Sequence, residues 1–452
     1  MNFTEMPLAD LRGGLAAGRW TCEQVTRWYL DRIERLDQSP GGTNAVSQIN
    51  PDALAIARDL DAHRTEKSGL PLYGLPVLVK ENIATADAMR TTAGTLALQN
   101  ARPVQDADVV RRLRAAGAVL LGKANMTEMA NYMSDRMPDG YSAVYGQVYN
   151  PYNRQVTPSG SSSGSGVAVA CNLCAFAIGT DTGGSVLGPS CYNGLCGLRP
   201  AAGSISTEGV VPISPTLDVW GPMARSVADA QLVTAALVDA FAPQSAPARP
   251  PRLLVDTSAS PYYDDGQQRA FQGVRARLEK AGVVLQEAPW GDYYKTLPIM
   301  RYELPAALSA YFGWAQDGSG VRSLADLVGF NQRLAETGRL RYGQVMLQGA
   351  LAEPQPAPDG EAYRQAMAAR RADKQAFVQA LAGWDGVLSP HADAMAPYMG
   401  LASATVPCAR LQNGLNYAFQ VIAETNAGAL ALAARLFDLV GLRFEPPGFG
   451  EA

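Results

Sequence analysis

Two glycine-rich runs carry the hydroxyl groups whose spacing is most suggestive of chemistry. The first is Thr157-Pro-Ser-Gly-Ser-Ser-Ser-Gly-Ser-Gly166, and the second is Asp181-Thr-Gly-Gly-Ser185. Glycine permits unusual backbone dihedrals, so the second run lets several successive N–H groups converge beside a hydroxyl. Such convergence is what an oxyanion hole requires. The two runs therefore favour a site in which a serine hydroxyl reacts.

Two other interpretations of the first run remain open. Its composition also fits a flexible linker, and a glycine-rich turn before a helix also fits a phosphate-binding loop. A linker joins independent domains, whereas this run lies between a predicted loop and the predicted apolar helix 167–174. The Gly-Lys-Ser/Thr ending of a phosphate-binding loop is absent. Both interpretations are therefore less favoured than a serine site.

A reactive serine needs a base, and the chain contains two histidines. His63 lies in the charged stretch 61–66, which we predict to be an exposed helix end, and His391 lies in a predicted loop. Neither has a supporting motif, so a Ser-His-Asp arrangement is a minor alternative.

Lys80 is a second candidate base. It ends the apolar segment 76–79, which we predict to be a short buried strand. Burial disfavours the ammonium form of a lysine and lowers its pKa toward neutrality, so that the amine can accept a proton. A strand-end lysine that reaches solvent is the alternative, and it is the commoner arrangement for lysines in general.

The elements around these residues alternate between the two kinds of secondary structure. Thr21 and Gln24 form a capping-box pattern at the start of one helix. Strands are expected at 76–79, 119–122, 175–179 and 253–256, and helices at 51–64, 109–116, 123–133 and 167–174, with 267–381 mainly helical. This alternation predicts an α/β fold.

Composition excludes several classes of protein. The 452 residues are 47% hydrophobic and 18% charged, as expected of a large globular chain. The net charge is −4 without a basic cluster, so nucleic acid is not an expected partner. No run reaches the roughly 18 apolar residues of a membrane helix. The first residues lack an export signal, so we expect a cytoplasmic protein without a membrane partner.

The six cysteines raise the question of a zinc site. Cys171 and Cys174 form a C-x-x-C pair, and Cys191 and Cys196 follow closely. The pair lies in a segment predicted as a buried apolar helix, where thiols usually act as small hydrophobes. We therefore expect no metal.

Several motifs follow one another along the chain in an order that resembles the amidase signature family. The resemblance is dense over residues 5–235 and looser beyond them. The motifs are Gly74-Leu-Pro-Val-Leu-Val-Lys80-Glu-Asn-Ile83, Thr91-Thr-Ala-Gly-Thr95, Gly122-Lys-Ala-Asn-Met-Thr-Glu128, the first Gly/Ser run, Gly179-Thr-Asp-Thr-Gly-Gly-Ser185, Gly197-Leu-Arg-Pro200 and Gly221-Pro-Met-Ala-Arg225.

The resemblance implies one α/β amidase signature domain over residues 1–452, with a central mixed β-sheet flanked by helices on both faces. Within it, residues 1–65 would form an N-terminal helical segment, 66–240 the catalytic core and 241–452 a variable, helix-rich part. The implied activity is hydrolysis of a carboxamide C–N bond without any cofactor.

The resemblance also implies the roles of individual residues. Ser185 would be the nucleophile, Ser161, 24 residues before it, the bridging serine after a cis peptide bond, and Lys80 the base. Ser162 would support Lys80 by a hydrogen bond. The oxyanion would be held by the backbone amides of Thr182, Gly183, Gly184 and Ser185.

The clearest departure from the family is Leu187, where most members have an arginine. Asp181 then loses its usual ion-pair partner, so either backbone donors satisfy it or its pKa rises. The stretch 137–151 is similar to the peptide amidase branch, which also lacks this arginine. This similarity favours a C-terminally amidated peptide or another bulky carboxamide as substrate.

Three other functions remain open. The glutaminase-type subunit of a tRNA-dependent amidotransferase shares the fold and the relay, an esterase would use the same nucleophile, and a non-catalytic binding protein would keep the fold alone. The expected partner is a small-molecule or peptide amide, and the expected state is a monomer or homodimer.

Overall fold

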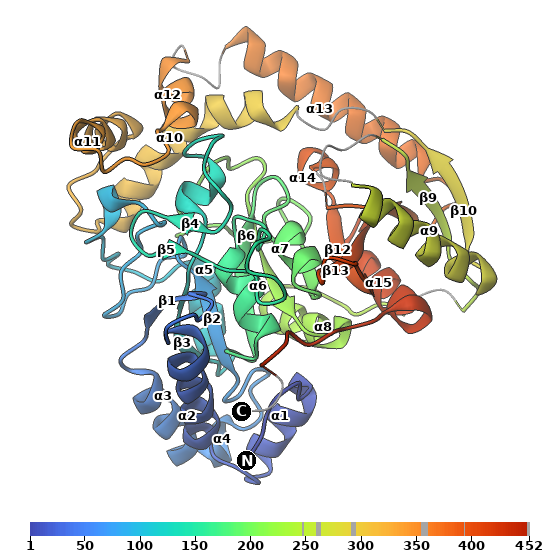
Figure 1. Ribbon diagram of the computed structural model, residues 1–452, viewed down its shortest axis with the longest axis horizontal. Helices are drawn as coiled ribbons and strands as arrows, with labels where there is room; N and C mark the ends of the chain where they lie inside the picture. Colours follow the sequence, from blue (N-terminus) through green and yellow to red (C-terminus); the bar gives the residue numbers. More distant parts are fainter. Residues whose placement is uncertain (246–247, 259–263, 291–294, 354–359, 393, 450–452) are drawn as a thin grey trace.

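A large mixed sheet forms the middle of the computed structural model (Figure 1), which describes residues 1–245, 248–258, 264–290, 295–353, 360–392 and 394–449. Eleven strands of these residues make one sheet, and β4 (Tyr141–Ser142) and β5 (Gly146–Gln147) form a separate pair. The order across the large sheet is β1 (Val46–Ile49), β3 (Val119–Ala124), β2 (Pro76–Lys80), β6 (Phe176–Asp181), β8 (Val219–Ala224), β7 (Cys196–Arg199), β12 (Ala402–Arg410), β13 (Asn416–Ala423), β11 (Gly386–Ser389), β9 (Arg252–Asp256) and β10 (Val284–Ala288).

Helices flank this sheet on both faces, which confirms the predicted fold class (Figure 1). Thr21 caps its helix and forms the reciprocal capping box with Gln24 that the sequence predicts. The described α-helices are α1 (Leu8–Ala16), α2 (Cys22–Arg32), α3 (Ala53–Ala62), α4 (Arg64–Lys67), α5 (Asp108–Ala115), α6 (Ser163–Ala170), α7 (Leu187–Tyr192), α8 (Val227–Leu237), α9 (Asp265–Lys280), α10 (Thr296–Ala315), α11 (Leu324–Glu336), α12 (Val345–Ala352), α13 (Glu361–Ala380), α14 (Met395–Met399) and α15 (Asn426–Val440).

The strands that matter most for the site lie side by side and run in the same direction. β2 pairs in parallel with β3 on one side and with β6 on the other, and Val79 is opposite both Lys123 and Ile178. All residues of the three strands are buried, as expected where helices cover both faces of a parallel segment. Because parallel strands end at the same edge, Lys80 and Asp181 emerge together.

Two expected helices differ from the structure. In 123–133, β3 continues to Ala124 and only a 3₁₀ turn follows, in which Met129, Ala130 and Asn131 have φ values of 48°, 53° and 72°. Left-handed backbone at three consecutive non-glycine residues cannot continue an α-helix. The expected helix 167–174 begins earlier, at Ser163, and ends at Ala170, so Cys171 and Cys174 lie in the turn before β6.

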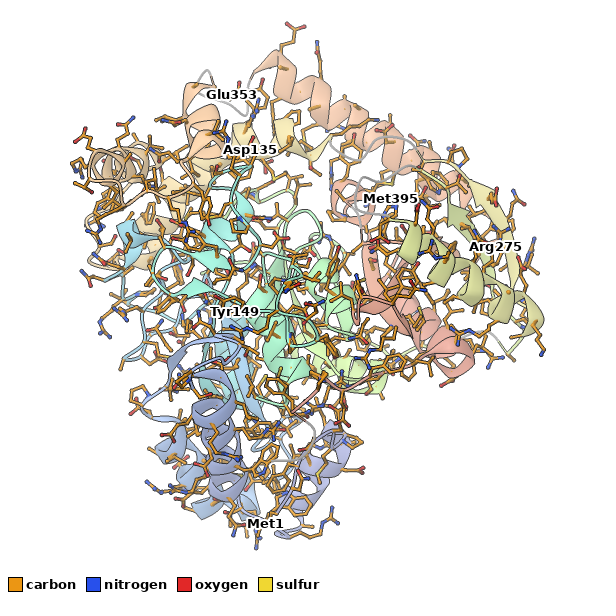
Figure 2. All side chains as sticks on the ribbon, viewed as in Figure 1. Met1, Asp135, Tyr149, Arg275, Glu353 and Met395 are labelled. Atoms are coloured by element: carbon orange, nitrogen blue, oxygen red, sulfur yellow. The ribbon has the colours of Figure 1, made fainter. Side chains whose placement is uncertain are left out.

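The predominantly helical character of 267–381 is confirmed for its described residues, with one strand that was not expected. β10 forms the edge of the sheet, and its side chains are mostly exposed. Arg275 of α9 lies at the periphery of the molecule (Figure 2) and pairs with Glu287 of β10 at 2.7 Å. A short edge strand whose side chains are mostly exposed lacks the alternation of apolar and polar residues by which strands are usually recognised.

No helix of the described residues has the length and apolar character needed to cross a membrane. The assignment of residues 1–452 to one domain, with the parts 1–65, 66–240 and 241–452, stays a prediction.

Candidate active site

Lys80 lies at the end of β2 and has no solvent exposure. Its Nζ is 2.7 Å from Ser161 Oγ, 2.8 Å from Thr180 Oγ1 and 3.2 Å from the Thr180 carbonyl oxygen. Burial lowers the pKa of Lys80 to about 7, although the negative charges of Asp181 and Asp218 act in the opposite direction. A large share of this amine is therefore uncharged near neutral pH.

Ser161 is held at the entrance to α6 by backbone contacts on both sides. The peptide bond between Gly160 and Ser161 is cis. The Ser161 carbonyl accepts a hydrogen bond from the amide of Thr127 at 3.0 Å. The next amide, that of Ser162, donates to the carbonyl of Ser185 at 3.2 Å. This last bond joins the two glycine-rich runs, which the sequence predicted to form one site.

The first run needs glycine for a packing reason. A methyl group at Gly164 would lie 2.3 Å from the backbone oxygens of both Ala45 and Asn125. Real side chains do not approach backbone atoms so closely, so α6 can pack here only through a residue without a Cβ. The absence of a side chain at Gly164 thus lets the helix that follows Ser161 pack against Ala45, next to β1, and Asn125, next to β3.

Asp181 organises the turn that carries Ser185. Its carboxylate accepts hydrogen bonds from the amides of Gly184 at 2.8 Å and Val186 at 2.7 Å. With leucine at position 187 instead of arginine, we expected either backbone donors for the Asp181 carboxylate or a raised pKa. The structure shows the backbone donors. Arg199 supplies a cation as well, because its Nε lies 3.5 Å from Asp181 Oδ1 and both side chains are fully buried.

The role of Arg199 was missed in the sequence, although its motif, 197–200, was noted. The guanidinium also donates from Nη2 to the Leu217 carbonyl at 2.7 Å. Burial lowers the pKa of Arg199, and Asp181 and Asp218 oppose that effect. Arg199 reaches Asp181 from a different strand, so no local spacing links the two residues.

Two expected contacts have different partners. The Gly184 amide donates to the carboxylate of Asp181, so it does not point toward a bound oxyanion. Within the described chain, the amides of Thr182, Gly183 and Ser185 have no protein acceptor. Ser162 Oγ bonds the backbone of Thr180, at 3.1 Å to its oxygen and 3.2 Å to its nitrogen, instead of Lys80. Ser162 therefore acts on Lys80 only through Thr180.

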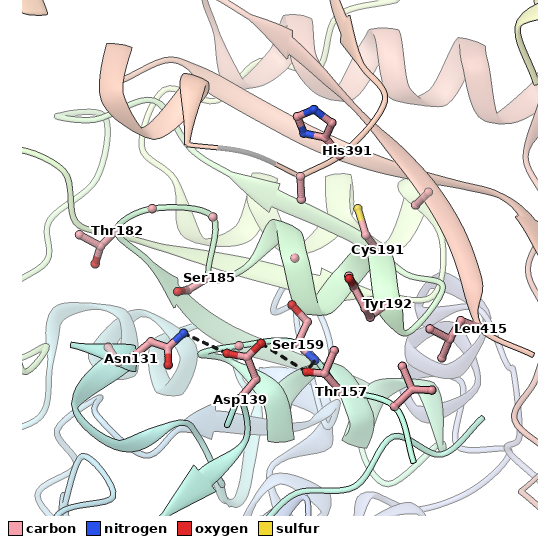
Figure 3. Close-up of a pocket in the computed structure, with 18 of the residues that line it drawn as sticks. Asn131, Asp139, Thr157, Ser159, Thr182, Ser185, Cys191, Tyr192, His391 and Leu415 are labelled. Carbon is pink, nitrogen blue, oxygen red and sulfur yellow. Dashed lines mark hydrogen bonds between the residues drawn. The ribbon is translucent and has the colours of Figure 1, made fainter. Parts of the chain in front are cut away.

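A cavity of about 480 Å³ opens beside these turns (Figure 3). Ser185 is half-buried and lines this cavity together with Gly160, Thr182 and Gly183. Apolar side chains cover much of the remaining wall, among them Leu297 and Met300 of α10, Met346 of α12, Leu411 and Leu415. Ser185 is therefore accessible to a bulky ligand.

The charged side chains that line this cavity are acidic. Asp139 and Asp264 contribute carboxylates, and none of the described residues that line it is a lysine or an arginine. His391 lines the same cavity, a position that the sequence did not reveal, but Figure 3 shows it well apart from Ser185. His63 lies elsewhere, on an exposed helix end where its Nδ1 pairs with Asp59 at 3.2 Å.

The six cysteines are all buried. Burial raises the pKa of Cys174 and of Cys196 to about 12, which favours the neutral thiol. Among the residues that the structure describes, no three His, Cys, Asp or Glu side chains are grouped so that they could hold a metal ion.

A family model described as Amidase matches residues 24–438, a range that includes Lys80, Ser161 and Ser185. The chain belongs to the amidase family. A relative in Arabidopsis thaliana described as a probable amidase is 36% identical, covering 76% of this chain and 71% of the relative. A glutamyl-tRNA(Gln) amidotransferase subunit of Salinispora tropica is 32% identical, covering 99% of each chain.

Among solved structures, the native peptide amidase of Stenotrophomonas maltophilia is 33% identical with a TM-score of 0.88, covering 98% of this amidase-family chain and 99% of that chain. An amidase family protein of Bacillus anthracis is 28% identical with a TM-score of 0.89, covering 98% and 92%. The fold and the family together make this protein a hydrolase of amide C–N bonds.

Proposed function

We propose that this amidase cleaves a neutral carboxamide through an acyl-enzyme on Ser185, with Lys80 as the base and Ser161 as the proton carrier between them. The observation that carries this proposal is the contact of 2.7 Å between Ser161 Oγ and a fully buried Lys80 amine whose pKa is about 7. An uncharged amine within hydrogen-bond distance of a hydroxyl can accept its proton.

Acylation begins with the transfer of two protons. Lys80 Nζ takes the proton of Ser161 Oγ as Ser161 takes that of Ser185. The Ser185 oxygen forms a bond to the amide carbon, and the carbonyl π electrons move onto oxygen. When the tetrahedral centre collapses, the C–N bond breaks and its electron pair goes to nitrogen. Ser161 protonates that nitrogen, Lys80 returns its proton to Ser161, and ammonia or an amine leaves.

Deacylation repeats these steps with water in place of the Ser185 hydroxyl. Water gives a proton to Ser161 and attacks the ester carbon, and the oxygen of Ser185 leaves with a proton from Ser161. A carboxylic acid is released and the three side chains regain their starting state. Every step uses groups of this chain and water.

The negative charge on the substrate oxygen would be held by the amides of Thr182, Gly183 and Ser185. These amides are not engaged by other described residues, whereas the amide of Gly184 is bonded to Asp181. Removal of one such donor typically costs about 10²–10³ in rate, so the organisation of this turn by Asp181 contributes directly to catalysis.

The cavity supports a bulky neutral amide as the substrate class. Its volume of about 480 Å³ and its largely apolar wall fit a peptide-sized acyl group. The resemblance in structure to a peptide amidase adds support for a C-terminally amidated peptide. The monomeric or homodimeric state and the cytoplasmic location expected from the sequence stay predictions.

The second candidate is a glutaminase-type subunit, which the similarity to a glutamyl-tRNA(Gln) amidotransferase subunit favours. Glutamine carries an α-carboxylate near its side-chain amide, and a carboxylate is usually bound by arginine or lysine. The described lining residues include neither, and they contribute two carboxylates instead. The α-ammonium group of glutamine would suit these carboxylates, but its α-carboxylate would find no lysine or arginine among the described lining residues, which supports a neutral amide over glutamine.

The test is release of ammonia by the purified chain from a blocked peptide amide, an aryl amide, an aliphatic amide and glutamine, with Ser185→Ala as the inactive control. We expect the blocked peptide amide to be cleaved and glutamine to be poor. Covalent labelling by a fluorophosphonate should occur on wild type and be lost in Ser185→Ala. An unlabelled wild-type protein that releases no ammonia from any of these amides would support a binding function instead.

A further inference from the structure

Asp139 is a carboxylate in the active-site cavity to which neither the motifs nor the relay gives a role. It is half-buried and lines the cavity with Ser185 and Gly160. Asn131 Nδ2 donates to its Oδ1 at 2.9 Å, and Thr157 Oγ1 donates to its Oδ2 at 3.3 Å (Figure 3). These two bonds hold the carboxylate group in one orientation.

The carboxylate lies directly against the peptide that carries Ser161. A methyl group at Gly160 would be only 2.8 Å from Asp139 Oδ1. Glycine at this position therefore lets the carboxylate approach the backbone that precedes the bridging serine. This carboxylate thus lies beside the residue that directly precedes the proposed proton carrier.

The position matters because of where the leaving nitrogen must lie. In the proposed mechanism, Ser161 protonates that nitrogen, so the nitrogen of a bound amide faces the segment Gly160–Ser161. An ionised carboxylate can only accept hydrogen bonds and has about four acceptor positions, of which Asn131 and Thr157 occupy two among the described residues. The remaining positions suit an N–H group of the substrate.

We propose that Asp139 accepts a hydrogen bond from the N–H of the scissile carboxamide and so makes the enzyme select amides over esters. This inference rests on the proposed function. An ester has an oxygen where the amide has N–H, and that oxygen would face a carboxylate without a proton to share. A primary carboxamide offers one N–H to Asp139 while its nitrogen still faces Ser161.

The competing explanation is that Asp139 only holds its loop in place. Its backbone oxygen does accept a hydrogen bond from Gln147 Nε2 at 2.7 Å, so the loop has other attachments. A purely structural residue would affect amides and esters alike, because both substrates need the same nucleophile and the same relay. The ratio between the two substrates therefore separates the two roles.

The experiment compares kcat/KM for a blocked peptide amide and for the methyl ester of the same peptide. Both substrates give the same acyl-enzyme, so their kcat/KM values differ only in binding and acylation. Asp139→Asn keeps one acceptor oxygen but loses the charge, so we expect kcat/KM on the amide to fall about 10-fold, the usual difference between a charged and a neutral hydrogen bond, and kcat/KM on the ester to change little.

The matched control is Asp135→Asn, which removes the same charge from an exposed position of the same loop outside the cavity. It should leave both substrates unchanged. Asp139→Glu keeps a carboxylate and should retain more of the amide preference than Asp139→Asn. Because each ratio is measured on one preparation, an unfolded fraction cancels.

Two results would overturn the inference, and they differ in what else they affect. If wild type cleaves both substrates and Asp139→Asn keeps the wild-type ratio, Asp139 does not recognise the N–H, while the proposed function stands. If wild type cleaves neither the amide nor the ester, the proposed function fails and the inference fails with it.

Discussion

Lys80 Nζ is bonded to both oxygens of Thr180, at 2.8 Å to the hydroxyl and 3.2 Å to the carbonyl. Thr180 thus sets the direction of the amine, while the buried end of β2 sets its position. Ser162 in turn holds the backbone of Thr180. The proposed base is therefore oriented by the strand that leads to the proposed nucleophile, β6.

The pH dependence of activity should follow the protonation of Lys80. Since the proposed mechanism needs the uncharged amine and the pKa of Lys80 is about 7, kcat/KM should be nearly constant above pH 8. Below pH 6 it should fall about tenfold per pH unit, as for a single required base. Lys80→Ala should lose most activity near neutral pH and recover part of it in alkali. A fully active Lys80→Ala enzyme at pH 7 would exclude this base.

Replacing Thr180 by valine should change both the rate and the pH profile. Valine keeps the shape of threonine but removes the hydroxyl that lies 2.8 Å from Lys80 Nζ. Loss of this acceptor disfavours the ammonium form, so the acid limb of the profile should move to lower pH while kcat falls. Thr180→Ser, which retains the hydroxyl, should keep the wild-type limb. A profile that does not move in Thr180→Val would show that the hydroxyl has no influence on the amine.

Loss of one member of the buried pair of Asp181 and Arg199 should strongly destabilise the protein. Removing one member of a buried ion pair leaves an uncompensated charge and typically costs about 3–5 kcal/mol of unfolding free energy. We expect losses of this size for Arg199→Met, measured by chemical denaturation. Arg275→Met, which breaks partly exposed pairs, should cost less than about 1 kcal/mol. Similar losses for both variants would contradict the assigned importance of burial.

The close packing of Gly164 gives a matched pair of glycine substitutions. Gly164→Ala should destabilise the protein by about 1–3 kcal/mol, as expected of overpacking, because its methyl group would meet two backbone oxygens at 2.3 Å. At Gly273, within α9, an added Cβ has no neighbour within 4 Å. Gly273→Ala should therefore stabilise the protein by about 0.5–1 kcal/mol. Thermal unfolding of both variants, at equal protein concentration, gives the comparison, and equal shifts would argue against close packing at Gly164.

The sequence predicted those features of the candidate site that follow from short local patterns of residues. The apolar residues before Lys80 indicated a buried strand, and burial is what lowers the pKa of Lys80, against the opposing charges of Asp181 and Asp218. The two glycine-rich runs were expected to meet, and the hydrogen bond from Ser162 to Ser185 joins them. Their order along the chain resembled that of the amidase family, to which the chain belongs.

Directions of individual groups were harder to predict. The amide of Gly184 donates to the carboxylate of Asp181, and the hydroxyl of Ser162 donates to the carbonyl of Thr180. Arg199 reaches Asp181 from another strand, and its effect depends on how the sheet is ordered. The contact of Arg199 is set by the packing of distant strands, on which local residue patterns carry no information.

The same limit applies to the fold. Alternating elements predicted the α/β class, but the left-handed residues after β3 include methionine and alanine, which rarely adopt that conformation and give no local signal for it. β10 was missed because it lies at the edge of the sheet with most of its side chains exposed, so its sequence shows no alternation of apolar and polar residues. The position of His391 in the cavity likewise depends on the return of the chain through the last strands.

Complete burial of Lys80 means that its basicity at neutral pH is a property of the assembled molecule. In a freshly synthesised or denatured chain this amine has the ordinary lysine pKa of about 10.4 and is almost entirely charged at pH 7. It becomes able to take a proton only once β2 is enclosed by β3, β6 and α6. On the proposed mechanism, a polypeptide that has not completed its folding therefore cannot cleave amides.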